Sequence, residues 1–177
     1  KFNNYKFEFN SKIIFLIFII GLIGNFIPFF LISWAEQFIP SSTAGMLMAI
    51  GPIITLVMSH FLTKNEKFSL MKIFSITIGL VGVFYIFNIS SIDNLFSSSS
   101  IEIYAKLLVI MAAFGYMFSN IIAYEKLSNI DSFSITTFAT TFGAIFSLPF
   151  FIYDIGINNF EYDFNYHSAY AIIYLGI

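Results

Sequence analysis

Long apolar stretches alternate with short polar segments along the whole chain. A helix needs about 20 apolar residues to cross the hydrocarbon core of a bilayer. Five stretches meet this requirement: residues 13–34, 43–62, 68–87, 103–124 and 133–153. The pattern therefore predicts an all-α fold, a polytopic bundle of transmembrane helices with about five full spans.

A sixth apolar stretch begins near Ser168 and stops at Ile177, which is too short to cross a bilayer. The first residue is Lys1 rather than Met. We therefore expect the chain to be an internal part of a longer membrane protein, with the start of a sixth span at its end.

Lysines occur only in every second connection between the expected spans. The lysine-bearing segments are residues 1–12, residues 64–72 and the segment after the fourth span, which holds Lys126. Cytoplasmic loops of membrane proteins carry an excess of Lys and Arg, so these segments are expected in the cytoplasm. Lys106 is the exception, and we expect its long side chain to reach from the outer end of its helix to water.

Composition sharpens the prediction of a membrane protein. Hydrophobic residues make up 58% of the chain and charged residues only 10%, where soluble domains carry about a quarter. The lipid bilayer is therefore the expected surrounding. The net charge of −2 and the lack of a basic stripe argue against a nucleic-acid partner. With no Cys, thiolate metal ligands and cysteine nucleophiles are excluded from this chain.

The central parts of the expected spans hold no Asp, Glu, Lys or Arg. Charges inside membranes usually mark ion relays, so a proton or sodium relay within this segment is not expected. His60 and His167 lie near span ends on opposite sides, which predicts no metal site. No nucleophile, zinc or phosphate-loop motif is present. The sequence thus predicts neither a cofactor nor an enzyme.

Small residues recur every four positions in three of the expected spans. The sets are Gly115, Ser119 and Ala123; Ala139, Gly143 and Ser147; and Ser75 with Gly79. Small residues at this spacing let the backbones of transmembrane helices approach closely. We expect these faces to be helix–helix contacts.

Uncharged polar residues inside the spans are the candidates for a solute cavity. Pro52 lies near the middle of the second span, and Met48, Thr55 and Ser59 share its helix face. Such a proline either improves helix packing or borders a watery cavity, and both alternatives stay open. Asn25 in the first span, and Tyr116 and Asn120 in the fourth, complete the candidate set.

Several short motifs, in this order and spacing, resemble EamA-type permeases of the drug/metabolite transporter superfamily. They are a small-residue helix start at residues 38–45, Gly51-Pro52, a Glu-containing segment at residues 64–69, Gly-x-x-Gly-Val at residues 79–83, and residues 112–127. The last of these resembles the helix that opens the second repeat of the family.

The resemblance implies ten helices in two inverted five-helix repeats, of which this chain would hold helices three to seven and the start of eight. Residues 1–90 would be the last helices of the first repeat, residues 91–102 an external linker, and residues 103–177 the truncated start of the second. The similarity between residues 172–177 and residues 18–22 fits this repeat relation.

The resemblance also implies a permease that moves small organic metabolites or drugs across the inner membrane, in most members outward, by alternating access. Its cavity would be lined by the candidates Asn25, Met48, Pro52, Thr55, Ser59, Tyr116 and Asn120. The alternative is a membrane scaffold or assembly subunit that transports nothing.

Overall fold

The structure, a computed structural model, describes residues 10–63, 69–86, 99–157, 166 and 170. It divides into two compact units, Lys1–Phe146 and Ser147–Ile177, which are described separately. All secondary structure in the described residues is helical, which confirms the predicted all-α fold. Four helical segments are long and apolar enough to span a membrane: Ser11–Ala35, Ser41–Leu62, Ser100–Lys126 and Ser132–Tyr153.

The first span consists of α1 (Ser11–Ile20), the π-helical segment η1 (Gly21–Phe26) and α2 (Ile27–Ala35). Asn10 caps the start of α1 because its Oδ1 accepts a hydrogen bond from the Lys12 N–H at 3.1 Å.

Pro28 explains the π-helical segment in the middle of this span. Proline has no N–H to donate to the carbonyl four residues back, and its ring clashes with that group, here in Gly24. The helix widens instead, and the Ile27 N–H donates to the Leu22 carbonyl five residues back. The predicted span is therefore present, with a π-helical segment near its middle.

The second span is interrupted more strongly. Helix α3 covers Ser41–Met48 and helix α4 covers Gly51–Leu62, with Ala49 and Ile50 in a turn between them. Pro52 thus stands in the first turn of α4, where its missing N–H costs no intrahelical hydrogen bond. The sequence predicted one helix with a proline in its interior, whereas the chain ends one helix and begins another.

Three more helices follow: α5 (Leu70–Ile86), α7 (Ser100–Lys126) and α8 (Ser132–Ile157). In α5 the described apolar helix, Leu70–Val83, is shorter than a full span, and both predicted ends of the third span lie outside the described residues. Helix α7 starts at Ser100, within the linker expected at residues 91–102. Most of that linker lies outside the described residues.

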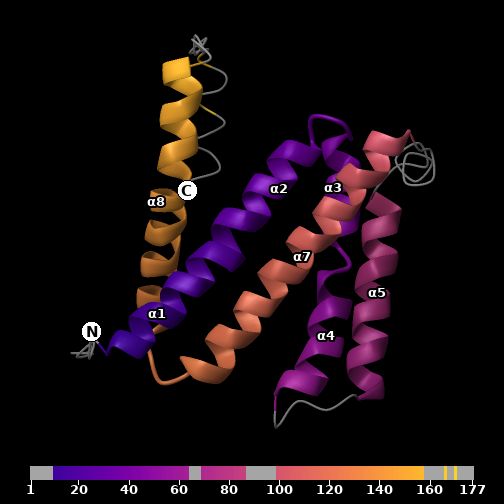
Figure 1. Cartoon of the computed structure of the whole chain (residues 1–177). Coiled ribbons are helices and arrows are strands. Elements are labelled where there is room, and N and C mark those ends of the chain that lie inside the picture. Colours follow the sequence, from indigo (N-terminus) through magenta and orange to yellow (C-terminus); the bar gives the residue numbers. More distant parts are fainter. Residues whose placement is uncertain (1–9, 64–68, 87–98, 158–165, 167–169, 171–177) are drawn as a thin grey trace. The chain divides into compact units, whose positions relative to one another are not determined.

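Helix α7 is the central packing partner in the unit Lys1–Phe146. It lies against α2, α3 and α4, and α5 lies beside α4 (Figure 1). One buried apolar cluster joins α2, α3 and α7 through Ala35, Ile39, Ala44, Ala105 and Val109. A second joins the start of the chain to α8 through Ile17, Ile20, Leu127, Ile135 and Ala139.

The predicted small-residue contacts hold for α7 and α8. A Cβ added at Gly115 would lie 3.0 Å from the Ile23 carbonyl oxygen, and one added at Gly143 would lie 3.1 Å from the Asn25 Cβ. Both glycines therefore face η1 at close range. For Gly79 the contact stays a prediction, since a Cβ there meets no described atom within 4 Å.

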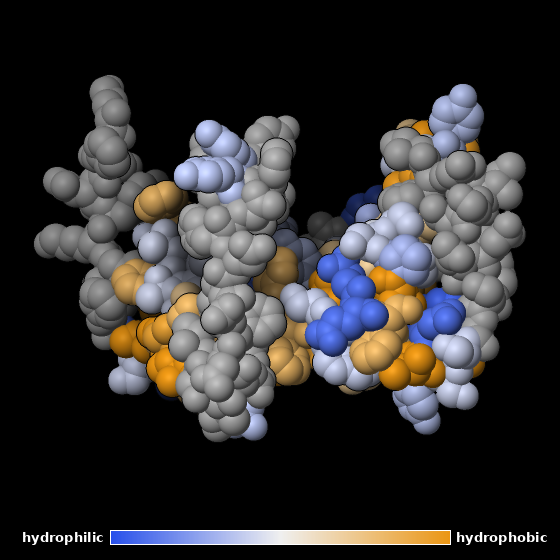
Figure 2. Space-filling model, turned by 90° about the horizontal axis from the view of Figure 1, so that it is seen from above, coloured by the Kyte–Doolittle hydropathy of each residue, from blue (hydrophilic) through white to orange (hydrophobic). Residues whose placement is uncertain are grey.

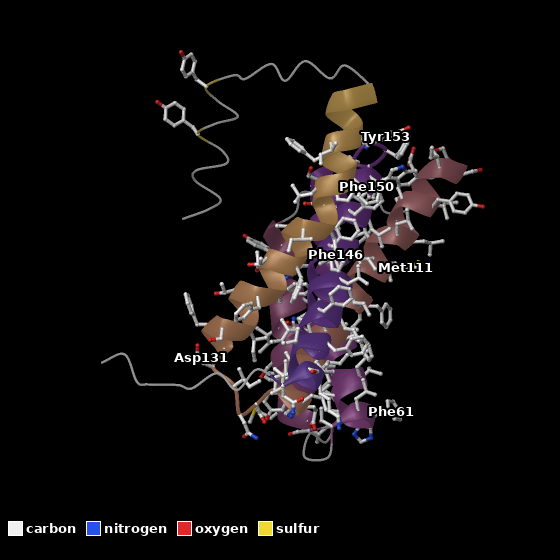
Figure 3. All side chains as sticks on the ribbon, turned by 60° about the vertical axis from the view of Figure 1, so that its left-hand side comes forward. Phe61, Met111, Asp131, Phe146, Phe150 and Tyr153 are labelled. Atoms are coloured by element: carbon white, nitrogen blue, oxygen red, sulfur yellow. The ribbon has the colours of Figure 1, made fainter. Side chains whose placement is uncertain are left out.

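Large apolar side chains cover much of the described surface, where Figure 2 shows them in orange beside polar groups. Phe61 at the end of α4 is 77% exposed and Met111 on α7 is 60% exposed (Figure 3). A soluble protein seldom exposes such extended apolar surface. Lipid tails solvate it, as expected for helices that span a bilayer.

The unit Ser147–Ile177 is described mainly by the last part of α8, with Pro149 inside that helix. Its apolar side chains Leu148, Phe150 and Phe151 are exposed. The predicted sixth span near Ser168, and the repeat relation of residues 172–177, lie outside the described residues.

Candidate functional site

Two helix irregularities lie near the middle of successive spans. The π-helical segment η1 is central in Ser11–Ala35, and the turn at Ala49 and Ile50 is central in Ser41–Leu62. Successive spans cross a membrane in opposite directions, so both irregularities fall at similar depth. Many transporters bind their solute near the midplane at interrupted helices.

A cavity of about 490 Å³ opens below the second irregularity, between α4, α5 and α7. We call it the α4–α5–α7 cavity. Its lining residues are Pro52, Thr55, Leu56 and Ser59 of α4, Met71, Lys72, Ser75 and Ile76 of α5, and Met117 of α7. All lie in the unit Lys1–Phe146.

Helix periodicity places the α4 lining residues together. Residues three or four positions apart share a helix face, and Pro52, Thr55 and Ser59 follow this spacing. The Thr55 hydroxyl donates to the Gly51 carbonyl at 3.0 Å, and the Ser59 hydroxyl donates to the Leu56 carbonyl at 3.1 Å. Their hydrogens are therefore engaged within α4, and their lone pairs remain as acceptors toward the cavity.

Helix α5 supplies the opposite wall in the same manner. Lys72, Ser75 and Ile76 share one of its faces. The Ser75 hydroxyl donates to the Met71 carbonyl at 2.9 Å, so it too presents lone pairs. Lys72 is the charged residue among the described cavity-lining residues, and it lies in the first turn of α5.

Gly51 brings α7 into the cavity wall. A Cβ added at Gly51 would collide with the terminal methyl of Met117. The absence of a side chain at the start of α4 is therefore what lets Met117 lie against the helix break. Since Met117 lines the cavity and Gly51 starts α4, this contact places the cavity directly beside the interruption of the second span.

The seven residues predicted to line one cavity are not gathered in one place. Pro52, Thr55 and Ser59 line the α4–α5–α7 cavity, whereas Met48 packs against the buried cluster of α2, α3 and α7. The helix break separates Met48 from the face that it was expected to share.

The other three predicted residues lie apart from this cavity. Asn25 belongs to η1 and faces Gly143 of α8, so it takes part in helix packing. Tyr116 and Asn120 are exposed on α7 and are not among the cavity-lining residues. Tyr116 does serve a local role, because its carbonyl accepts a hydrogen bond from the Ser119 hydroxyl at 2.8 Å.

Sequence reasoning missed Met117 and the α5 wall because nothing in the local pattern of α4 indicates which helices lie beside it. The sequence indicates Lys72 only as one of the lysines that predict the orientation. Lys106 also differs from expectation: it is 8% exposed and buried on α7, rather than reaching out to water.

The ring of His60 packs edge-on against Phe61, with ring centroids 5.3 Å apart, and His167 lies outside the described residues. Across the described ranges, no three His, Cys, Asp or Glu residues come together in a group that could hold a metal ion.

Comparison with known proteins adds independent information. The model of the EamA-like transporter family matches residues 2–88. The chain is similar to the uncharacterized transporter YoaV of Bacillus subtilis, with 25% identity over 148 residues, 83% of this chain and 48% of the relative. It is also similar to the uncharacterized transporter YetK of the same organism, with 24% identity over 173 residues, 92% of this chain and 49% of the relative.

The chain spans about half the length of these two curated relatives. No solved structure matches it. Spanning helices and bacterial transporter relatives together make the chain a multi-pass integral membrane protein of the bacterial inner membrane. The motif order, the helical fold and the family match agree: residues 2–88 match the EamA-like transporter family.

Proposed function

We propose that the full-length protein exports small organic metabolites or drugs by alternating access, and that the α4–α5–α7 cavity is part of the solute pathway. The observation that carries this proposal is the helix break at Gly51 and Pro52 directly beside a cavity with hydroxyl groups. The match to the EamA-like transporter family supports transport as the general activity.

The energetic reason concerns the backbone at the break. Pro52 offers no N–H to the carbonyl of Met48. A polar backbone group that faces lipid tails without a partner costs several kcal/mol, whereas one beside water or a polar solute does not. A helix interruption is therefore stable where the freed carbonyl meets water or a polar solute, and we propose that the cavity beside the break admits them.

The first span provides the contrast. Its irregular segment η1 is enclosed by α7 and α8, with Gly24 against Ser119 and Gly143 against Asn25. That arrangement fits a packing role. For Pro52, where both alternatives were left open, we therefore propose the solute pathway, whereas η1 fits a packing role.

The experiment measures efflux of labelled small metabolites per folded molecule in cells that express the full-length protein. Pro52→Ala restores a donor to the Met48 carbonyl, favours a continuous helix and should lower efflux about tenfold. Thr55→Val removes a cavity hydroxyl and should lower it about fivefold. Thr137→Val is the matched control, because that exposed hydroxyl donates to the Phe133 carbonyl in α8 away from the cavity.

Unchanged efflux in both Pro52→Ala and Thr55→Val would remove α4 from the pathway. The scaffold alternative makes a different prediction. Under it, the two variants change only the amount of folded protein, and no solute changes the thermal stability of the wild type.

A further inference from the structure

Met117 is the α7 residue among the described residues that line the α4–α5–α7 cavity. We infer that the cavity takes uncharged solutes with an apolar body and a hydrogen-bond donor, and that Met117 sets how long this body can be. The inference rests on the proposed function, because it names the solute class and a specificity-determining residue of the same cavity.

Met117 stands at one end of the cavity, next to the helix break. Helices α4 and α5 lie side by side and run in opposite directions (Figure 1). The α4 wall extends from Pro52 at the break to Ser59, and seven residues of helix span about 10 Å. The terminal methyl of Met117 lies against Gly51, the residue before Pro52. A solute that lies along the α4 wall therefore meets Met117 at the break.

The end of the Met117 side chain can move while the backbone stays in place. A Cβ added at Gly51 would collide with the terminal methyl, whereas the sulfur would lie 3.5 Å and the Cγ 3.8 Å away. Only the far end of a flexible side chain would have to shift, and methionine adapts readily to its surroundings. Gly51→Ala should therefore leave the fold intact and displace this methyl group into the cavity. Met117→Ala should instead lengthen the cavity toward Gly51.

The uncharged part of the lining indicates the class of solute. Hydrocarbon and thioether side chains make up much of it: Pro52, Leu56, Met71, Ile76 and Met117. The hydroxyls of Thr55, Ser59 and Ser75 donate to carbonyls of their own helices, so they offer lone pairs to a donor on the solute. Lys72 already takes part in an interaction of its own, and none of the described lining residues is a carboxylate. An apolar solute with an alcohol or amide donor therefore matches the groups that the cavity offers.

The test measures binding of three alcohols to the purified full-length protein in phosphatidylcholine nanodiscs: 2-phenylethanol, 3-phenyl-1-propanol and 4-phenyl-1-butanol. The quantity compared is the ratio of the affinity for the longest alcohol to the affinity for the shortest. Partitioning into the lipid is the same for every variant, so a change in this ratio between variants reports on the protein. Each methylene group that gains apolar contact raises the affinity about fourfold.

The variants assign the length preference to one side chain. Met117→Ala should raise the ratio about fourfold, because the space beside Gly51 accepts a further methylene group. Gly51→Ala should lower the ratio about fourfold. In the double variant the ratio should recover to at least the wild-type value, because the added methyl group has no methionine to displace. Met111→Ala is the matched control and should leave the ratio unchanged, since this methionine is exposed on the same helix and does not line the cavity.

Four results would overturn the inference. They are an unchanged ratio in Met117→Ala, a double variant with a ratio as low as that of Gly51→Ala, absent binding of all three alcohols to the folded wild type, and loss of folding in Gly51→Ala. Melting temperatures establish that each variant is folded. The proposed function is tested separately by the efflux of Pro52→Ala and Thr55→Val. A pathway that selects the length of its solute elsewhere would pass that test and fail this one.

Discussion

Single residues without side chains determine how closely the first span packs. A Cβ added at Gly24 would collide with the hydroxyl of Ser119 and lie 2.6 Å from its Cβ. One added at Gly21 would lie 2.7 Å from the Ala139 carbonyl oxygen. The π-helical segment therefore contacts α7 and α8 at distances that only glycine permits.

Gly24→Ala should lower the melting temperature of the detergent-solubilised protein. The Ser119 Cβ is fixed to the α7 backbone and cannot move aside, and overpacking of this kind costs about 1–3 kcal/mol. Gly79→Ala is the matched control, because no described atom lies near its added methyl group. Ser119→Gly should restore stability in combination with Gly24→Ala, and a double variant no more stable than Gly24→Ala alone would refute the assigned contact.

At the scale of helices, two prolines at similar depth have different consequences. Pro28 is buried, and the chain around it stays helical by shifting to five-residue hydrogen bonds. Pro52 is exposed, lines the cavity and follows the two-residue turn between α3 and α4. The first span packs closely against α7 and α8 at η1 and stays helical. The second span lies beside the α4–α5–α7 cavity and is divided into α3 and α4.

The contact between η1 and α8 gives the prediction at this scale. Gly143→Leu should destabilise the fold by about 1–3 kcal/mol, because its side chain would press on Asn25 and force the helices apart. Phe138→Leu, a change on the exposed side of the same helix, should cost less than about 1.5 kcal/mol. Thermal unfolding in detergent compares the two variants, and equal melting temperatures would contradict the placement of Gly143.

For the molecule as a whole, the orientation in the membrane follows from the lysine pattern rather than from any contact. The connection between α2 and α3 contains Gln37 and no lysine, whereas the connection between α7 and α8 follows Lys126. From the positive-inside rule we expect the first outside the cell and the second in the cytoplasm.

This orientation is tested by cysteine labelling. Gln37→Cys and Asn129→Cys are each introduced into a cysteine-free full-length protein, and both positions are exposed. An impermeant thiol reagent added to whole cells should label Gln37→Cys and leave Asn129→Cys unlabelled until the membrane is opened. The reverse pattern would invert the topology and place the Lys72 end of the cavity outside.

Much of the helical fold could be read from the sequence. Runs of about 20 apolar residues must form helices in lipid, because every backbone polar group needs a partner inside the segment. Small residues at four-residue spacing in α7 and α8 indicated the faces that approach η1, and the structure confirms this for Gly115 and Gly143. These features depend on local composition and on the bilayer, so the sequence was sufficient for them.

The candidate site could be predicted only in part, because its walls come from segments far apart in the chain. The periodicity of α4 indicated Pro52, Thr55 and Ser59, and these three do line the cavity. Whether a proline produces a π-helical turn or a full break depends on the neighbouring helices. Tertiary packing alone decided three features. It placed Met117 against Gly51 and made α5, with Lys72, a wall of the cavity. It also placed Met48 in a buried cluster away from the cavity.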